Sequence, residues 1–233
     1  MIQRTTHAIY GEVGVTDGDK AIGQHILEGR VWEPHMTATF DRILPSVQGF
    51  CVDIGAHVGL HSLYMANRLG KKVIAIEPQP LLFSLLVENI VSNQASIIPI
   101  QKIVSNQDGM LNMGIPKSYD TFSNPGGLGV VEAHFKHPEL IKWELPCSRL
   151  DSMRLGKIGF IKIDVEGHEM EVLQGAADTL ERDRPIMIIE LYGGCDRHEY
   201  ADRLRQRIRD IEKSYKYSLK YIGGCDYLCS PTA

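Results

Sequence analysis

The stretch CVDIGAHVGL, residues 51–60, decides the fold. Its first residues are a short apolar run, which is typical of a buried strand. Gly55 permits a tight turn after this strand, and Gly59 lets the next helix start close to the sheet. Packing explains the apolar residues but not Asp53 at the strand end. The stretch therefore predicts a strand, a turn and a helix whose backbone amides face a ligand.

The alternation of strand and helix continues along the chain. Apolar runs predict buried strands at residues 50–54, 72–77, 96–104, 159–165 and 185–191, and helical spacing occurs at residues 60–69, 81–91, 168–181 and 199–212. Pro99 places the third strand at a sheet edge or a bulge. The runs YSLKYIG and DYLCS predict a C-terminal hairpin. We therefore expect an α/β fold with a Rossmann-like, doubly wound sheet of seven strands, mostly parallel with the antiparallel C-terminal hairpin.

The chain divides into an extension and one large domain. Residues 1–45 are expected to form an N-terminal extension, whose helix at 31–44 is entered at Pro34 and packs on the core. Residues 46–233 form the main domain. Within it, residues 105–157 exceed what a crossover needs, and we interpret them as a substrate lid that contains His134 and His137. A surface excursion without a role is the alternative.

Composition excludes several classes of protein. The 233 residues are 43% hydrophobic and 23% charged, and the net charge of −4 provides no basic field for nucleic acid or an anionic membrane. The five cysteines form no Cys-x-x-Cys pair, so reduced thiols are expected rather than a disulfide framework or a zinc site. There is no apolar leader and no apolar run of membrane-spanning length. We expect a soluble, cytoplasmic protein.

Three strand ends carry polar residues that packing does not require. Asp53 ends the first strand, Glu77 ends the second, and Asp164, Glu166 and His168 follow the fourth. The Gly-x-x-x-Gly spacing lacks the middle glycine with which dinucleotide-binding enzymes approach a pyrophosphate, which argues against a nicotinamide-dependent oxidoreductase. A carboxylate suits a ligand with an ammonium and a sulfonium group, which describes S-adenosylmethionine. For Asp53, capping of the next helix is the structural alternative.

Three segments resemble one known family: CVDIGAHVGLHSLYMA, VIAIEPQP and especially IKIDVEGHEMEVLQGA. They look like the FkbM-type methyltransferases, a branch of the class I S-adenosylmethionine-dependent enzymes. The resemblance covers roughly residues 31–230, and it departs from the family at His57, where asparagine is usual.

The resemblance implies roles for individual residues. Those expected to line the methionine and sulfonium side of S-adenosylmethionine are Asp53, Gly55, Ala56, His57 and Gly59. Glu77, followed by Pro78, would bind the ribose hydroxyls. The adenine is expected against the loop after the third strand, where Ser105, Asn106 and Asp108 are candidates.

The fourth strand end is expected to face the reactive methyl group. Asp164 would contact the cofactor there, beside Glu166 and His168. His168 is the first choice for a general base because histidine titrates near neutral pH, and Asp164 is the alternative. Capping of the next helix by Asp164 or Glu166 is the structural alternative. These three residues could also hold a divalent metal, but residues flanking a helix start need not converge, so no metal site is predicted.

The resemblance implies an S-adenosylmethionine-dependent enzyme that releases S-adenosylhomocysteine. The expected reaction is O-methylation of a hydroxyl on a sugar or a secondary-metabolite-type small molecule. An N-methyltransferase acting on an amide or peptide, and a cofactor-binding protein without transfer activity, are the alternatives. An RNA methyltransferase would need a basic, aromatic-rich platform, which a chain with 7% aromatic residues and an acidic balance does not supply. The oligomeric state stays open, with a homodimer among the alternatives.

Overall fold

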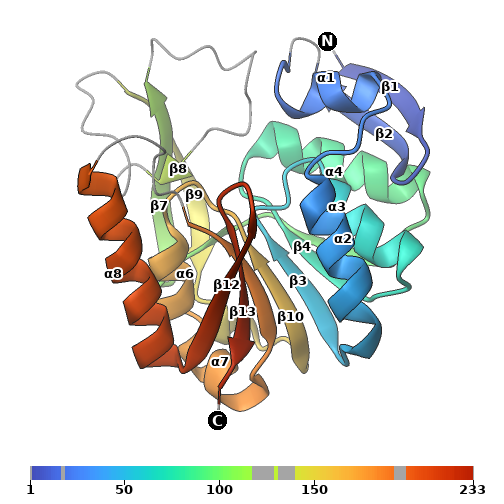
Figure 1. Cartoon of the computed structure of the whole chain (residues 1–233). Coiled ribbons are helices and arrows are strands. Elements are labelled where there is room, and N and C mark those ends of the chain that lie inside the picture. Colours follow the sequence, from blue (N-terminus) through green and yellow to red (C-terminus); the bar gives the residue numbers. More distant parts are fainter. Residues whose placement is uncertain (1, 17–18, 117–128, 131–139, 192–197, 233) are drawn as a thin grey trace.

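A seven-stranded sheet forms the centre of the protein (Figure 1). The computed structural model describes residues 2–16, 19–116, 129–130, 140–191 and 198–232. The strand order is β12-β13-β11-β10-β3-β4-β5. The strands are β3 Phe50–Ile54, β4 Val73–Ile76, β5 Ile97–Ile100, β10 Ile158–Ile163, β11 Ile186–Glu190, β12 Tyr217–Gly223 and β13 Asp226–Pro231. The first five are parallel, and β13 pairs antiparallel with β11 and β12, which confirms the predicted fold and its hairpin.

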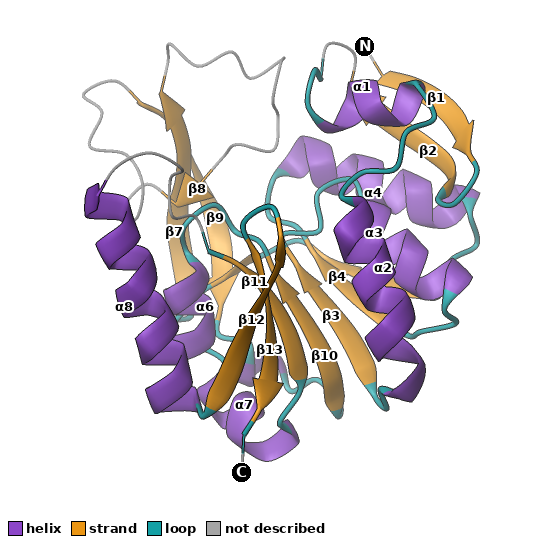
Figure 2. Cartoon of the chain, viewed as in Figure 1, coloured by secondary structure: helices purple, strands orange, loops and turns teal. Residues whose placement is uncertain are grey.

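Helices cover both faces of the sheet (Figure 2). One face carries α2 Pro34–Ile43, α3 Leu60–Leu63 and α4 Pro80–Ser92, and the other carries α6 Glu169–Gln174, α7 Ala177–Asp183 and α8 His198–Tyr215. Alternate strand residues enter different cores: Cys51 packs with the α2, α3 and α4 side, and Val52 packs with the α6, α7 and α8 side. Asp53 therefore points towards α2 and α3. No helix in the described part of the chain is long and apolar enough to cross a membrane.

The N-terminal residues form a hairpin and two helices. Strands β1 Ile2–His7 and β2 Gly11–Thr16 pair antiparallel, α1 Ile22–Leu27 follows, and α2 begins at Pro34 as predicted. The buried side chain of Asn89 on α4 accepts from the amide of Gly14 at 2.7 Å and donates to the carbonyl of Val58 at 2.9 Å. The side-chain amide of Asn89 thus links the N-terminal hairpin to the loop that precedes α3. The domain boundary at residue 45 stays a prediction.

The predicted strand at residues 96–104 is wrong, because the segment contributes to two sheets. Strand β5 is the edge of the seven-stranded sheet, as Pro99 indicated, whereas β6 Ile103–Val104 belongs to a second sheet with order β6-β9-β7-β8. Ile103 and Val104 are buried, so the apolar pattern continues although the chain changes sheet. The loop after β5 therefore lies at residues 101–102 rather than at 105–108.

The second sheet is built from the segment interpreted as a lid. Its remaining strands are β7 Gly109–Pro116, β8 Gly129–Val130 and β9 Leu140–Ser148. Residues 117–128 and 131–139, including His134 and His137, lie outside the described residues. The lid stays a prediction.

The predicted helix at residues 168–181 is also wrong, because it is interrupted after Gln174. A Cβ atom on Gly175 would lie 1.9 Å from the carbonyl oxygen of Ser105. The end of α6 therefore contacts the backbone after β6, and the chain turns before α7 begins. Three single turns complete the description: η1 Leu44–Ser46, the π-helical η2 Tyr64–Arg68 and η3 Asp151–Met153.

Candidate active site

A cleft of about 210 Å³ lies beyond the carboxyl ends of β3, β4, β10 and β11. In a doubly wound sheet this is the edge where ligands bind. Its lining contains seven of the predicted site residues: Gly55, His57, Pro78, Glu77, Asp164, Glu166 and His168. Three separate strand ends therefore meet at one cleft.

The turn after β3 is held by the end of β4. The amides of Gly55 and Ala56 donate to the carbonyl oxygen of Ile76 at 2.9 and 3.1 Å. The expectation that these amides face a ligand is therefore wrong. Gly59 has φ +89° and is the N-cap residue of α3, where a Cβ atom would lie 2.5 Å from Cδ1 of Leu86. Ala56 and Gly59 shape the turn without lining the cleft.

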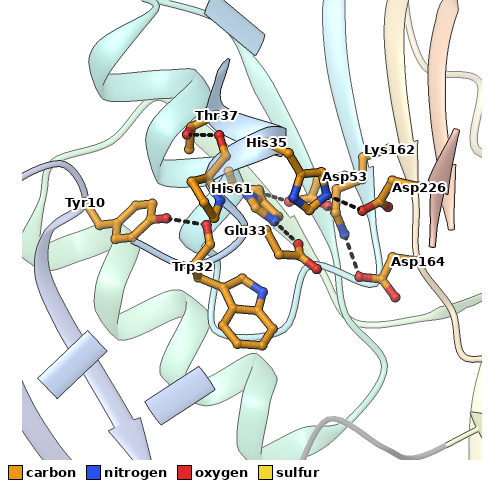
Figure 3. Close-up of polar contacts among 12 residues, drawn as sticks. Tyr10, Trp32, Glu33, His35, Thr37, Asp53, His61, Lys162, Asp164 and Asp226 are labelled. Carbon is orange, nitrogen blue, oxygen red and sulfur yellow. Dashed lines mark hydrogen bonds and ion pairs between the residues drawn. The ribbon is translucent and has the colours of Figure 1, made fainter. Parts of the chain in front are cut away.

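Asp53 is completely buried and does not line the cleft. Its Oδ2 accepts from the hydroxyl of Ser62 at 2.6 Å. Nζ of the buried Lys162 lies 3.7 Å from Asp53 Oδ1 and 2.9 Å from Asp164 Oδ2 (Figure 3). Contacts within the protein thus account for Asp53, and Lys162 connects it to the cleft.

Asp164 and Glu190 are neighbouring carboxyl groups at the ends of the paired strands β10 and β11, and both line the cleft. Burial opposes ionisation of Asp164, but the charge of Lys162 and the hydrogen bond from Glu190 outweigh it and lower the Asp164 pKa. Burial and the charge of Asp164 raise the pKa of Glu190 to about 10. Glu190 is not among the residues predicted from the sequence, although it ends a buried strand as Glu77 does.

Glu77 is buried and held in place by two amides. Its Oε2 accepts from the amide of His57 at 2.9 Å, and its Oε1 accepts from the amide of Gln79 at 2.9 Å. Burial raises the pKa of Glu77 to about 7, and the charges of Asp164 and Asp53 act in the same direction. A carboxylate has about four acceptor sites, so both oxygens can still accept from a ligand.

His57 has φ +54°, and its side chain borders the same cleft. Among the described residues, neither of its ring nitrogens has a hydrogen-bond partner. Burial lowers the pKa of His57 to about 4, so the ring is neutral at physiological pH. Its backbone, rather than its ring, positions Glu77.

Glu166 lines the cleft at the sharp turn between β10 and α6. Its backbone has φ +53°, which is unusual for a residue with a side chain, and Gly167 follows with φ +94°. Burial raises the pKa of Glu166 to about 7, and the charges of Asp164 and Glu169 add to this effect. This carboxyl group therefore titrates near neutral pH.

His168 is the N-cap residue of α6 and is buried. Its Nε2 shares a hydrogen bond of 2.9 Å with Oγ of Ser105, and its Nδ1 lies 3.6 Å from Oε2 of Glu171. The structure therefore brings together the predicted base and a predicted adenine contact, but they bind each other.

The three adenine candidates do not line the cleft. The side-chain Nδ2 of Asn106 donates to Oε1 of Gln174 at 2.9 Å, and Asp108 accepts from the hydroxyls of Ser148 and Ser152 at 2.7 Å each. These side chains stabilise the turn after β6. Because the loop after β5 comes earlier than predicted, Lys102 and Ile103 reach the cleft instead.

The N-terminal extension supplies one wall of the cleft. Trp32 and Glu33 line it, together with Ala21 and Ile22. The carbonyl of Trp32 accepts from the hydroxyl of Tyr10 at 3.1 Å, and Oε2 of Glu33 lies 2.9 Å from Nε2 of His61 (Figure 3). No motif in the sequence indicated these contacts, because they depend on how the extension packs.

The strand-end acids are not arranged as metal ligands in the described part of the chain. No group of three His, Cys, Asp or Glu side chains there could hold a metal ion. Asp164 instead pairs with Lys162, and His168 with Ser105.

The relatives found by comparison with known proteins are named as methyltransferases. The chain is 28% identical over 147 residues to the hexuronic acid methyltransferase AglP of Haloferax volcanii, covering 62% of this chain and 56% of that protein. It is 27% identical over 164 residues to the methyltransferase sdnD of Sordaria araneosa, covering 57% and 61% respectively. The chain thus spans less than two thirds of the length of either relative.

Solved structures share the fold. A candidate caffeoyl-CoA O-methyltransferase from Staphylococcus aureus superimposes with a TM-score of 0.54 and 10% identity, over 89% of this chain and 88% of that one. The methyltransferase FkbM domain itself matches residues 53–219, which is most of the chain. The chain therefore belongs to the FkbM methyltransferase family.

Proposed function

We propose that the protein is an S-adenosylmethionine-dependent methyltransferase that releases S-adenosylhomocysteine. The acceptor is a hydroxyl group on a sugar or a secondary-metabolite-type small molecule. The meeting of Gly55, Glu77 and Asp164 at one cleft carries this proposal. The printed name of the Haloferax relative, a hexuronic acid methyltransferase, supports a sugar-like acceptor.

The residues present fit this cofactor. Gly55 lines the cleft at the turn after β3, and Glu77 is fixed where it can accept from two ribose hydroxyls. Carboxylates attract a ligand that carries an ammonium and a sulfonium charge, and the lowered pKa of Asp164 keeps this cleft carboxylate ionised. The adenine would lie near Pro78 and Ile103.

S-adenosylmethionine, when bound, supplies a methyl group on a sulfonium whose sulfur leaves as a neutral thioether. The residues of the protein hold the acceptor in position and take up the proton of its hydroxyl group. Holding the acceptor in line can lower the barrier by about 7–11 kcal/mol. The acceptor hydroxyl also loses a proton, and a base within reach contributes roughly 10²–10⁴-fold.

We assign the role of base to Glu166 rather than to His168. Glu166 lines the cleft with a pKa raised by burial to about 7. His168 is engaged with Ser105 through Nε2 and lies beside Glu171 through Nδ1. His168 then acts by joining α6 to the segment after β6.

A transfer assay with a labelled methyl donor and a panel of acceptors tests this function. We expect O-methylated product from at least one hydroxyl compound, and a loss of roughly 10²–10⁴-fold in the Glu166→Gln variant. His168→Ala should retain most of the turnover of its folded fraction. Products methylated on nitrogen would favour the N-methyltransferase alternative. Cofactor binding without transfer to any acceptor would favour the binding protein.

A further inference from the structure

Asp164 and Glu190 lie side by side on neighbouring parallel strands. Ile163 of β10 is in register with Ile189 of β11, so the next residue of each strand is at the same level. Their side chains therefore project from neighbouring positions about 4.7–4.9 Å apart along the sheet, and both line the cleft. Two carboxylates at this separation cannot both be ionised without strong repulsion, so the pair holds a proton.

The surrounding charges decide which carboxyl group is ionised. Nζ of Lys162 lies 2.9 Å from Oδ2 of Asp164. The other acids that interact with the pair come from several elements. Glu166 follows β10, Glu33 precedes α2, and Asp226 lies opposite Glu190 on β13. Glu77 after β4 and Glu169 in α6 also interact with Asp164.

Histidines accompany two of these acids. His61 lies 2.9 Å from Glu33, and His35 lies 2.7 Å from Asp226 (Figure 3). Among the described residues, no basic side chain forms an ion pair with Glu190. The cation is therefore on the Asp164 side, and the proton is on the Glu190 side.

We propose that Glu190 is a positioning residue that stays protonated and donates its hydrogen bond to Asp164, which keeps one fixed carboxylate directed at the cleft. The pKa of about 10 that burial and Asp164 impose on Glu190 agrees with this geometry. The role of Asp164 towards the cofactor rests on the proposed function, but the location of the proton does not.

A protonated Glu190 has a consequence for Glu166. The pair then carries a single negative charge throughout the neutral range, so the charge changes near pH 7 occur on Glu166 and Glu77 rather than on the pair. Without the proton on Glu190, a second negative charge would face Glu166 and raise its pKa further.

Unfolding of the ligand-free whole chain between pH 5 and 9 tests the proposal. The folded-state pKa of Glu190 lies above its unfolded value, so wild-type stability declines as pH rises from the unfolded towards the folded pKa. Glutamine keeps the donor but cannot ionise. We expect Glu190→Gln and the wild type to have similar unfolding constants near pH 5. Above pH 5, the unfolding constant of the wild type should rise relative to that of the variant by up to tenfold per pH unit.

The exposed Glu181 supplies the matched control. A similar pH-dependent gap in Glu181→Gln would overturn the proposal, because the effect would then not belong to Glu190. Parallel curves for the wild type and Glu190→Gln would overturn the proposal, because Glu190 would then be ionised in the folded protein. The result does not depend on whether Glu190→Ala folds.

Calorimetry with S-adenosylhomocysteine tests the positioning role separately. Glu190→Gln should bind within about threefold of the wild type, whereas Glu190→Ala should bind about tenfold more weakly because Asp164 loses its donor. Equal affinity in both variants would overturn the positioning role. If the wild type binds no S-adenosylhomocysteine, the proposed function fails, and the unfolding result still shows where the proton lies.

Discussion

A Cβ atom on Gly55 would lie 1.7 Å from the carbonyl oxygen of Asp164. The turn after β3 thus contacts the backbone at the end of β10, with no space for any side chain between them. Because Gly55 also has φ +81°, both its conformation and its surroundings require glycine. This contact places the turn after β3, whose His57 amide donates to Glu77, next to the acids that follow β10.

Gly55→Ala should lower the free energy of unfolding by more than about 3 kcal/mol. A left-handed conformation costs roughly 1–2 kcal/mol for a residue with a Cβ, and the displaced backbone of Asp164 adds to it. Gly70 is the matched control, since it has φ +63° but no atom within 4 Å of an added Cβ. Urea unfolding measures both variants. Equal losses would mean that the contact with Asp164 does not restrict this position.

Asp53→Ala should destabilise the protein strongly, by about 3–5 kcal/mol, because it removes one partner of the buried Lys162. It also removes the acceptor of the Ser62 hydroxyl. Since Asp53 does not line the cleft, the folded fraction should bind S-adenosylhomocysteine with an affinity within about tenfold of the wild type. Chemical unfolding and calorimetry check the two effects. A variant of normal stability that has lost binding would restore the role that the family resemblance implies for Asp53.

Binding of S-adenosylhomocysteine should depend on pH through Glu77. Burial sets the pKa of Glu77 to about 7 in the free protein, and ribose hydroxyls that donate to it favour the ionised form. Binding below pH 7 therefore releases a proton, and affinity falls by up to tenfold per pH unit. Calorimetry in buffers with different ionisation heats measures the released proton.

Glu166→Gln is the control for that experiment, because Glu166 also titrates near pH 7. Proton release should persist in Glu166→Gln and disappear in Glu77→Gln. An affinity of the wild type that is constant from pH 6 to pH 8 would contradict the assignment.

His57→Asn should stabilise the protein by about 0.5–1 kcal/mol. Asparagine adopts positive φ more readily than histidine, and the change removes two ring nitrogens that lack partners among the described residues. Binding should change little, because the backbone amide of residue 57 holds Glu77. Thermal unfolding and calorimetry decide the matter. A loss of affinity greater than tenfold would show that the ring itself contacts the ligand.

Strand ends could be predicted from the sequence because local patterns determine them. The run at residues 50–54 and the acids Glu77 and Asp164 indicated the sheet, its ligand edge and part of the cleft. The apolar pattern did not predict the end of β5, because buried residues continue where the chain passes from one sheet to the other. Ile103 is as buried as a core strand residue, so the loop after β5, and the adenine candidates with it, were placed too late.

Contacts between distant segments could not be predicted in this way. Glu33 reaches the cleft because α2 packs on the sheet and His61 holds its side chain. Asp53 has the residue type expected of a ligand contact, but Lys162 from another strand pairs with it. Neither partner is near in sequence, so only the folded chain identifies them.

Calorimetric titration with S-adenosylhomocysteine at pH 8, on the wild type and Glu77→Ala, tests the central claim most directly. We expect a dissociation constant in the micromolar range for the wild type, and no measurable binding by a Glu77→Ala variant that still unfolds cooperatively. Absence of binding by a well-folded wild type, or equal binding by the variant, would contradict the assignment of this cleft to S-adenosylmethionine.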